Sequence, residues 1–219
     1  MPIFRIGSDL GFFAHVPKCA GSSIETYLAE RFGPLAFVDR AFREQSGPQR
    51  WTKSSPQHLP VSALERLFPP GFFACSFAVV RDPVDRLRSA FQVQRDVIGR
   101  IPRKTSFGAW LTTVEDAHAS KPWYLDNHAR PMDDLVPEEA VIFRLEDGLE
   151  PVVAWLDAQA GNADGPRQIG TQNTRADIFA SRTQDLPPRP PVRKADRVAV
   201  ARIFARDYAR FGYDPEKEN

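Results

Sequence analysis

Cysteine is scarce in this sequence: the 219 residues contain two, Cys19 and Cys75. Two cysteines cannot form the disulfide framework of a small secreted protein. An excess of one charge is also missing, because 29 Lys and Arg face 28 Asp and Glu for a net charge of +1. This balance argues against a strongly basic protein that binds nucleic acid.

Long hydrophobic runs are absent as well. No apolar stretch reaches the ~18–20 residues that span a bilayer. The N-terminus has neither the apolar core nor the small-residue cleavage site of a signal peptide. We therefore expect a cytoplasmic protein without a transmembrane segment.

The composition that is present is that of an ordinary globular protein. Hydrophobic residues make up 42% and charged residues 26%, which is enough apolar material for a packed core. We find no internal repeat and predict a single domain over residues 1–219. The sequence leaves the oligomeric state open.

Short apolar segments alternate with amphipathic helical patterns along the chain. The stretch from Phe72 to Val80 is nearly all apolar, which predicts a strand buried on both faces of a parallel sheet. Further strands are expected at 11–16 and 140–143, and helices after residue 21, at 60–68, from 83, at 107–114, around 152–156 and at 194–211. The alternation predicts a three-layer α/β/α fold with a mainly parallel central sheet.

The first candidate site is the junction between the first apolar run and the helix after it. Residues 15–23 read HVPKCAGSS. The free amides and dipole of a helix N-terminus attract anions. Gly21 permits close approach, and Lys18 adds a positive charge. The motif is not a Walker A loop, because the lysine precedes the glycine. The alternative is an ordinary turn with an exposed lysine.

The second candidate site follows the 72–80 strand. Arg81 stands at the carboxyl end of this strand, where ligands bind in open α/β sheets. Ser89 lies about two turns into the next helix, so the two side chains could hold a second phosphate. The alternative is a structural arginine paired with Asp82 or Asp85.

Residues 17–23 (PKCAGSS) and 81–89 (RDPVDRLRS) together resemble the two phosphate motifs of the PAPS-dependent sulfotransferases. The resemblance is to the carbohydrate branch that includes heparan sulfate 2-O-sulfotransferase, with this chain as a soluble bacterial-type member. Segments 127–132, 143–147 and 205–213 are also similar to family motifs. The resemblance implies a P-loop NTPase-like sulfotransferase fold and PAPS as donor. It assigns donor binding to Pro17, Lys18, Cys19, Ala20, Gly21, Ser22, Ser23, Arg81 and Ser89.

Sulfuryl transfer requires a base for the acceptor's proton and positive charge at the leaving oxygen. We predict Lys18 as the residue that stabilises the leaving oxygen. His58 is the predicted base, because the family carries a catalytic histidine in the corresponding interval. His128 is the competing base; it and Arg130 are also predicted to bind substrate. Of the other histidines, we expect His15 to support the first loop.

The acceptor is predicted to be a hydroxyl of a carbohydrate or glycolipid. Four basic residues either line a cleft for an acidic saccharide or form a solvated surface: Arg95, Arg100, Arg103 and Lys104.

We expect His118 to be exposed. No Cys/His cluster has metal-ligand spacing, so no metal is expected. The loop at 161–192 is either a lid or a connector. A nucleotide-dependent kinase and a non-catalytic nucleotide-binding module are the alternative functions.

Overall fold

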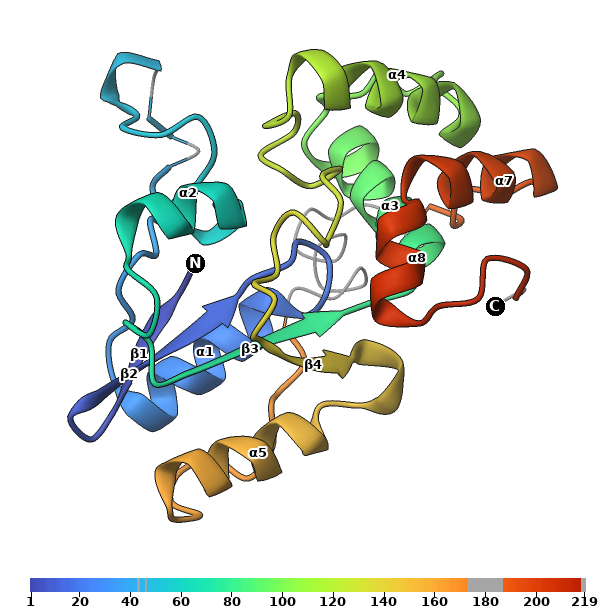
Figure 1. Ribbon diagram of the computed structural model, residues 1–219. Helices are drawn as coiled ribbons and strands as arrows, with labels where there is room; N and C mark the ends of the chain where they lie inside the picture. Colours follow the sequence, from blue (N-terminus) through green and yellow to red (C-terminus); the bar gives the residue numbers. More distant parts are fainter. Residues whose placement is uncertain (43, 46, 173–186, 218–219) are drawn as a thin grey trace.

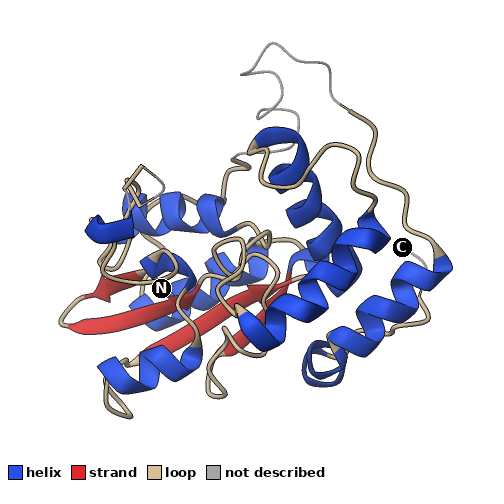
Figure 2. Cartoon of the chain, turned by 90° about the horizontal axis from the view of Figure 1, so that it is seen from above, coloured by secondary structure: helices blue, strands red, loops and turns tan. Residues whose placement is uncertain are grey.

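The computed structural model describes residues 1–42, 44–45, 47–172 and 187–217. Within these residues a four-stranded sheet has the order β1-β2-β3-β4. Its strands are β1 (Ile3–Ile6), β2 (Asp9–Ala14), β3 (Cys75–Val80) and β4 (Val141–Arg144). β1 is antiparallel to β2, whereas β2, β3 and β4 run parallel. Helices cover both faces of the sheet (Figures 1 and 2), which confirms the predicted α/β fold with a mainly parallel sheet.

The interior position of β3 explains its apolar sequence. Phe77, Ala78 and Val80 are completely buried. β3 pairs with β2 on one side and with β4 on the other. The predicted strand began at Phe72, three residues too early. A turn around Gly71, whose φ of 75° suits glycine, delays the start of the strand.

β1 was not among the strands predicted from the sequence. This strand has only four residues, and it turns back onto β2 through Gly7, which has a φ of 59°. β2 itself begins at Asp9 and ends at Ala14, two residues earlier at each end than the predicted 11–16. Its end is set by a turn in which the amide of Val16 donates to the carbonyl of Ala14.

The longer helices follow the predicted order, with shifted ends. They are α1 (Gly21–Phe32), α2 (Val61–Leu67), α3 (Pro83–Gln92), α4 (Phe107–Ser120), α5 (Glu150–Ala160), α7 (Lys194–Ile203) and α8 (Ala205–Phe211). α3 starts with Pro83 in its first turn, and the carboxylate of Asp82 accepts the amide of Asp85 at 2.9 Å. α3 continues into a π-helical turn, Val93–Val97. The single helix predicted at 194–211 is divided at Phe204 into α7 and α8.

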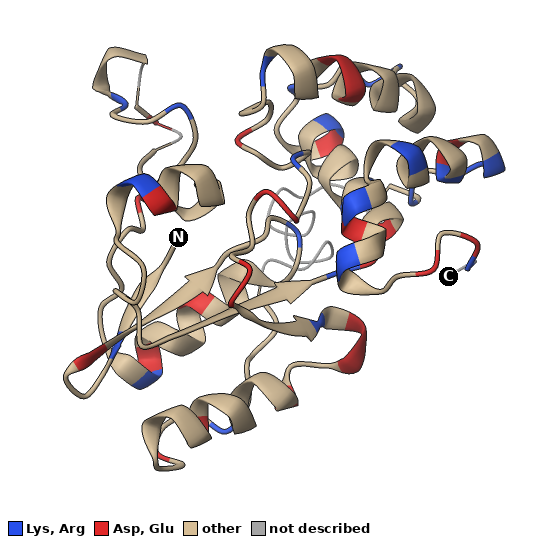
Figure 3. Cartoon of the chain, in the orientation of Figure 1, with Lys and Arg blue, Asp and Glu red and all other residues tan. Residues whose placement is uncertain are grey.

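A second apolar core lies beside the sheet. It is formed by α3, α4, α7 and α8, which gather at the upper right of Figure 1. Trp110, Phe91 and Phe204 fill its centre, so Trp110 serves packing. Acidic and basic residues are interspersed over these helices (Figure 3). None of the helices described is long and apolar enough to cross a membrane.

Candidate functional site

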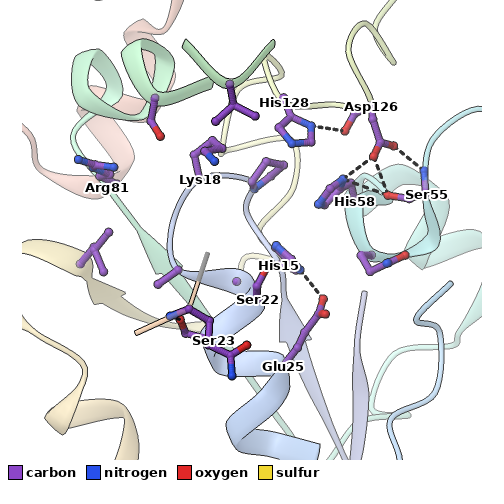
Figure 4. A pocket seen from close by; sticks show the side chains of 18 of the residues that line it. His15, Lys18, Ser22, Ser23, Glu25, Ser55, His58, Arg81, Asp126 and His128 are labelled. Atoms are coloured by element: carbon purple, nitrogen blue, oxygen red, sulfur yellow. Dashed lines mark hydrogen bonds and ion pairs between the residues drawn. The ribbon is translucent and has the colours of Figure 1, made fainter. Parts of the chain in front are cut away.

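A cavity of about 990 Å³ opens at the carboxyl ends of β2 and β3. Figure 4 shows side chains from both sequence-predicted junctions around it. Ten of the predicted residues line it: Pro17, Lys18, Ala20, Gly21, Ser22, Ser23, His58, Arg81, Ser89 and His128. The parallel arrangement of β2 and β3 explains this convergence, because parallel strands end at the same edge of a sheet.

The first wall of the cavity is the anion loop, residues 15–23. Lys18 and Ala20 adopt left-handed conformations, with φ of 71° and 61°. Ala20 is the N-cap of α1 and offers no capping side chain to the first amides of the helix. These amides and the helix dipole therefore make the start of α1 suitable for an anion.

Gly21 is the first residue of α1, and it packs directly on an imidazole. A methyl group at this position would overlap the ring of His15. The Nδ1 atom of His15 lies 2.6 Å from Oε1 of Glu25, which is also on α1. The His15–Glu25 pair thus lies directly beneath the backbone of the anion loop.

Burial lowers the pKa of His15 to about 4, although the hydrogen bond to Glu25 works in the opposite direction. His15 is therefore neutral at neutral pH and donates its Nδ1 proton to the carboxylate. Burial alone would raise the pKa of Glu25, but the hydrogen bond from His15 lowers it below its usual value. The pair consequently combines a neutral imidazole with an ionised carboxylate.

Arg86 of α3 is a buried anchor that the sequence analysis missed. Its side chain is fully buried, and Nε donates to the carbonyl of Pro17 at 3.2 Å. Its Nη2 atom donates to the carbonyl of Arg130 at 2.8 Å. The signal in the sequence was an arginine directly beside Leu87, within the buried stripe of an amphipathic helix. Arg86 ties the anion loop to the segment around residue 130.

Two predicted site residues do not reach the cavity. Cys19 is buried beneath the loop, and burial raises the pKa of its thiol to about 12, which keeps it protonated and unreactive. The side chain of Arg130 pairs with Asp134 at 3.1 Å and lines a separate, smaller pocket. In that pocket His118 is half-buried, with Nε2 at 2.8 Å from the carbonyl of Ala129, so the expectation that His118 is exposed is wrong.

The opposite wall carries the base cluster, which consists of Ser55, His58, Asp126 and His128. The Nδ1 atom of His58 lies 3.0 Å from Oδ2 of Asp126 and 3.0 Å from Oγ of Ser55. The rings of His58 and His128 meet edge to face, with centroids 5.0 Å apart. On its other side, His58 meets the ring of His15 at 4.8 Å. Figure 4 shows Asp126 pointing toward both Ser55 and His58.

Asp126 is the second residue that the sequence analysis missed. Burial alone would raise its pKa. The hydrogen bond from His58, the charges of His58 and His128 and the amide of Ser55 together hold it well below its usual value. A carboxylate is therefore present beside the imidazole at neutral pH. The only hint in the sequence was its position immediately before the Asn127-His128 dipeptide.

One ligand atom from each of His58, Asp126 and His128 lies within 4.8 Å of the others, an arrangement that could hold a metal ion. Their facing atoms already bond to protein groups. Nδ1 of His58 contacts Asp126, and Nδ1 of His128 lies 3.2 Å from the carbonyl of Asp126. These contacts favour two imidazoles held in fixed orientations over a metal site. The absence of a metal remains a prediction.

The cavity also receives basic side chains that the sequence analysis did not select. Arg40, Arg88 and Arg189 line it together with Lys18 and Arg81. The four basic residues considered for an acidic saccharide do not line it: Arg95, Arg100, Arg103 and Lys104. Arg95 instead forms an ion pair with Asp96 at 2.6 Å. Part of the predicted lid or connector, residues 173–186, lies outside the described residues.

Comparison with protein families agrees with this geometry. The chain matches the model described as the sulfotransferase family over residues 7–214. It therefore belongs to the sulfotransferase family, a class of transferases that generally take PAPS as donor. No curated protein and no solved structure gives a significant match.

Proposed function

We propose that this protein transfers a sulfuryl group from PAPS to a hydroxyl of a carbohydrate or glycolipid, with His58 as general base. The observation that supports the proposal is that the anion loop, Arg81 and the base cluster line the same cavity. The anion loop and Arg81 lie on one side, and the base cluster lies on the other. A transferase needs this combination of an anion-binding half and a proton acceptor.

The donor half matches the chemistry of an adenosine bisphosphate derivative. The amides of α1, Lys18 and Ser22 suit the 5′-phosphosulfate, and Arg81 with Ser89 suits the 3′-phosphate. The cavity of about 990 Å³ is large enough for a nucleotide and part of an acceptor. When bound, PAPS supplies the sulfuryl group.

The residues of the chain divide the chemical step between them. The acceptor hydroxyl forms an O–S bond as the bond between sulfur and the 5′-phosphate oxygen breaks. The hydroxyl proton passes to Nε2 of His58, and the ammonium of Lys18 stabilises the charge on the leaving oxygen. The products are a sulfate ester and adenosine 3′,5′-bisphosphate.

The charges around the base cluster favour an uncharged acceptor. Acidic side chains on this side of the cavity include Asp39 and Asp126, and Gln57 adds a neutral polar group. The donor is highly anionic, and basic residues that line the cavity, such as Lys18 and Arg81, can balance its charge. We therefore propose a neutral sugar hydroxyl, free or lipid-linked, in preference to a polyanionic saccharide.

The donor assignment can be tested by calorimetric titration with adenosine 3′,5′-bisphosphate, 5′-AMP and ATP. Adenosine 3′,5′-bisphosphate should bind most tightly. Arg81→Ala should weaken it by about 10–100-fold, the scale expected for a charged hydrogen bond. The matched control is Arg95→Ala, which removes an arginine outside the cavity and should leave binding unchanged. A preference for ATP would contradict the proposal.

The transfer itself can be followed with radiolabelled PAPS and a panel of neutral and acidic saccharides and glycolipids. His58→Asn should lower kcat by about 10²–10⁴-fold and leave the affinity for adenosine 3′,5′-bisphosphate intact. The equivalent His128→Asn variant decides between the two candidate bases. Added EDTA should not change the rate.

A further inference from the structure

The position of His58 depends on a residue 68 positions away in the sequence. Oδ2 of Asp126 lies 3.0 Å from Nδ1 of His58 and also accepts the hydroxyl of Ser55 at 3.0 Å. Oδ1 of Asp126 accepts the amide of Ser55 at 2.6 Å. Both carboxylate oxygens are thus engaged by the short segment that carries the imidazole.

The backbone around Asp126 is bent to make these contacts. Leu125, Asp126 and Asn127 have φ values of 52°, 60° and 60°, a run of left-handed residues without a glycine. Left-handed conformations are unfavourable for residues that carry a side chain, so the surrounding contacts must maintain the turn. One of them is the bond from Nδ2 of Asn127 to the carbonyl of His58 at 2.7 Å. The turn therefore holds His58 by its backbone and by its ring.

A carboxylate can only accept a hydrogen bond, so the contact to Asp126 requires a proton on Nδ1 of His58. The neutral ring then has its lone pair on Nε2. We infer that Asp126, assisted by Ser55, is a positioning residue that fixes His58 in the Nδ1–H form and leaves Nε2 to accept the acceptor's proton. This inference rests on the proposed role of His58 as base.

Asp126 also compensates the positive charge that His58 gains when it accepts the proton. The other groups around His58 are two imidazoles, a carboxylate and an amino group. His15 and His128 touch its ring, and Glu25 lies behind His15. The Met1 amino group donates to the carbonyl of Pro56, in the same short segment. Among these groups Asp126 makes the direct ionic contact with His58.

Asp126→Asn is the decisive variant. An asparagine can still accept the amide of Ser55 through Oδ1, which preserves the turn. Its amide group donates toward Nδ1 of His58 and so forces the proton onto Nε2. We expect kcat to fall by about 10²–10⁴-fold. The donor KM and the affinity for adenosine 3′,5′-bisphosphate should stay at their wild-type values. Ser55→Ala should lower kcat less, by about tenfold, the scale of one hydrogen bond.

The matched comparator is Glu25→Gln, which neutralises the carboxylate of the other histidine pair in the same cavity. It should lower thermal stability without changing which nitrogen of His58 carries the proton. In Asp126→Asn, the proton of the His58 ring should instead move from Nδ1 to Nε2, because the asparagine amide donates to Nδ1. A purely structural role for Asp126 predicts equal behaviour of the two variants, and this would overturn the inference.

Nuclear magnetic resonance gives a readout that is independent of catalysis. Long-range ¹H–¹⁵N correlations, assigned by comparison with His58→Asn, should show the Nδ1–H form of His58 in the wild type and the Nε2–H form in Asp126→Asn. An Nε2–H form in the wild type overturns the inference even if sulfuryl transfer is confirmed. Failure of the proposed function would instead appear in the titration of the wild type, which would then bind adenosine 3′,5′-bisphosphate no more tightly than 5′-AMP or ATP.

Discussion

At the scale of single residues, Gly21 is the position where the anion loop has least room. The backbone there lies against the ring of His15, which Glu25 holds from the other side. No side chain fits between the loop backbone and the imidazole, so this position requires a glycine.

Gly21→Ala should therefore weaken the binding of adenosine 3′,5′-bisphosphate by about tenfold or more, since the loop or the His15 ring must move. Gly47→Ala is the matched control, because open space surrounds that glycine. Calorimetric titration of both variants checks the prediction. Equal affinities for the two variants would show that the packing of His15 on the loop does not matter for binding.

The part of the site that could be predicted from sequence is local. Lys18, Gly21 and Arg81 stand at strand ends next to helix starts, and such junctions can be recognised in a short window. Asp126 and Arg86 could not be assigned in this way. Asp126 acts on a residue 68 positions away, and Arg86 reaches the carbonyl of Pro17 69 positions away. Nothing in the local sequence encodes such long-range contacts.

At the scale of elements, α8 is attached to the rest of the fold through a buried carboxylate. Oδ2 of Asp207 accepts the amide of Met132 at 2.9 Å, and Oδ1 accepts the amide of Asp133 at 2.9 Å. Burial raises the pKa of Asp207 to about 6. The side chain of Asp207 thus helps to fix the segment that leads from the base cluster to β4.

Asp207→Ala should lower the free energy of unfolding by about 2–5 kcal/mol, because two backbone amides lose their acceptor. The control on the same helix is Arg206→Ala. Arg206 forms ion pairs with Asp133 and Asp134, but its side chain is 64% exposed, so its loss should cost about 0–1 kcal/mol. Urea denaturation of both variants measures the difference, and similar losses would contradict the assigned role of Asp207.

The elements themselves were predictable where the apolar pattern was strong. β3 and α3 were recognised because one is a continuous apolar run and the other has Asp82 and Pro83 at its start. β1 was missed because four residues carry too little periodicity. The division of the last helix at Phe204 was missed because Val200, Phe204 and Tyr208 form one continuous apolar stripe on both sides of the break.

At the scale of the whole molecule, stability should respond to pH through its buried ionisable groups. The pKa of His15 lies near 4 in the folded protein, against 6.5 for an unperturbed histidine. The unfolded chain therefore binds a proton between these values that the folded protein does not. The stability contributed by neutral His15 is present above pH 6.5 and is lost as the pH falls toward 4. Asp207, with its raised pKa, has the opposite effect between about pH 4 and 6.

Because the two groups partly offset each other, the test compares the wild type with His15→Asn. The stability of the wild type relative to this variant should decrease by up to roughly 1.4 kcal/mol for each pH unit between about 6.5 and 4. Denaturation at several pH values provides the measurement. A difference that is independent of pH would show that His15 binds its proton equally well in the folded and unfolded chains.

The guanidinium of Arg86 links the two walls of the cavity. It donates to the backbone of the anion loop at Pro17 and, at Arg130, to that of the segment that carries Asp126 and His128. Two sites joined in this way obey thermodynamic reciprocity: whatever the donor does to the acceptor's affinity, the acceptor does equally to the donor's. Lysine in place of Arg86 would keep the positive charge. Its single ammonium could not reproduce the planar guanidinium, which donates to both carbonyls. Arg86 therefore joins the two walls of the cavity through their backbones, which the charge of the side chain alone would not do.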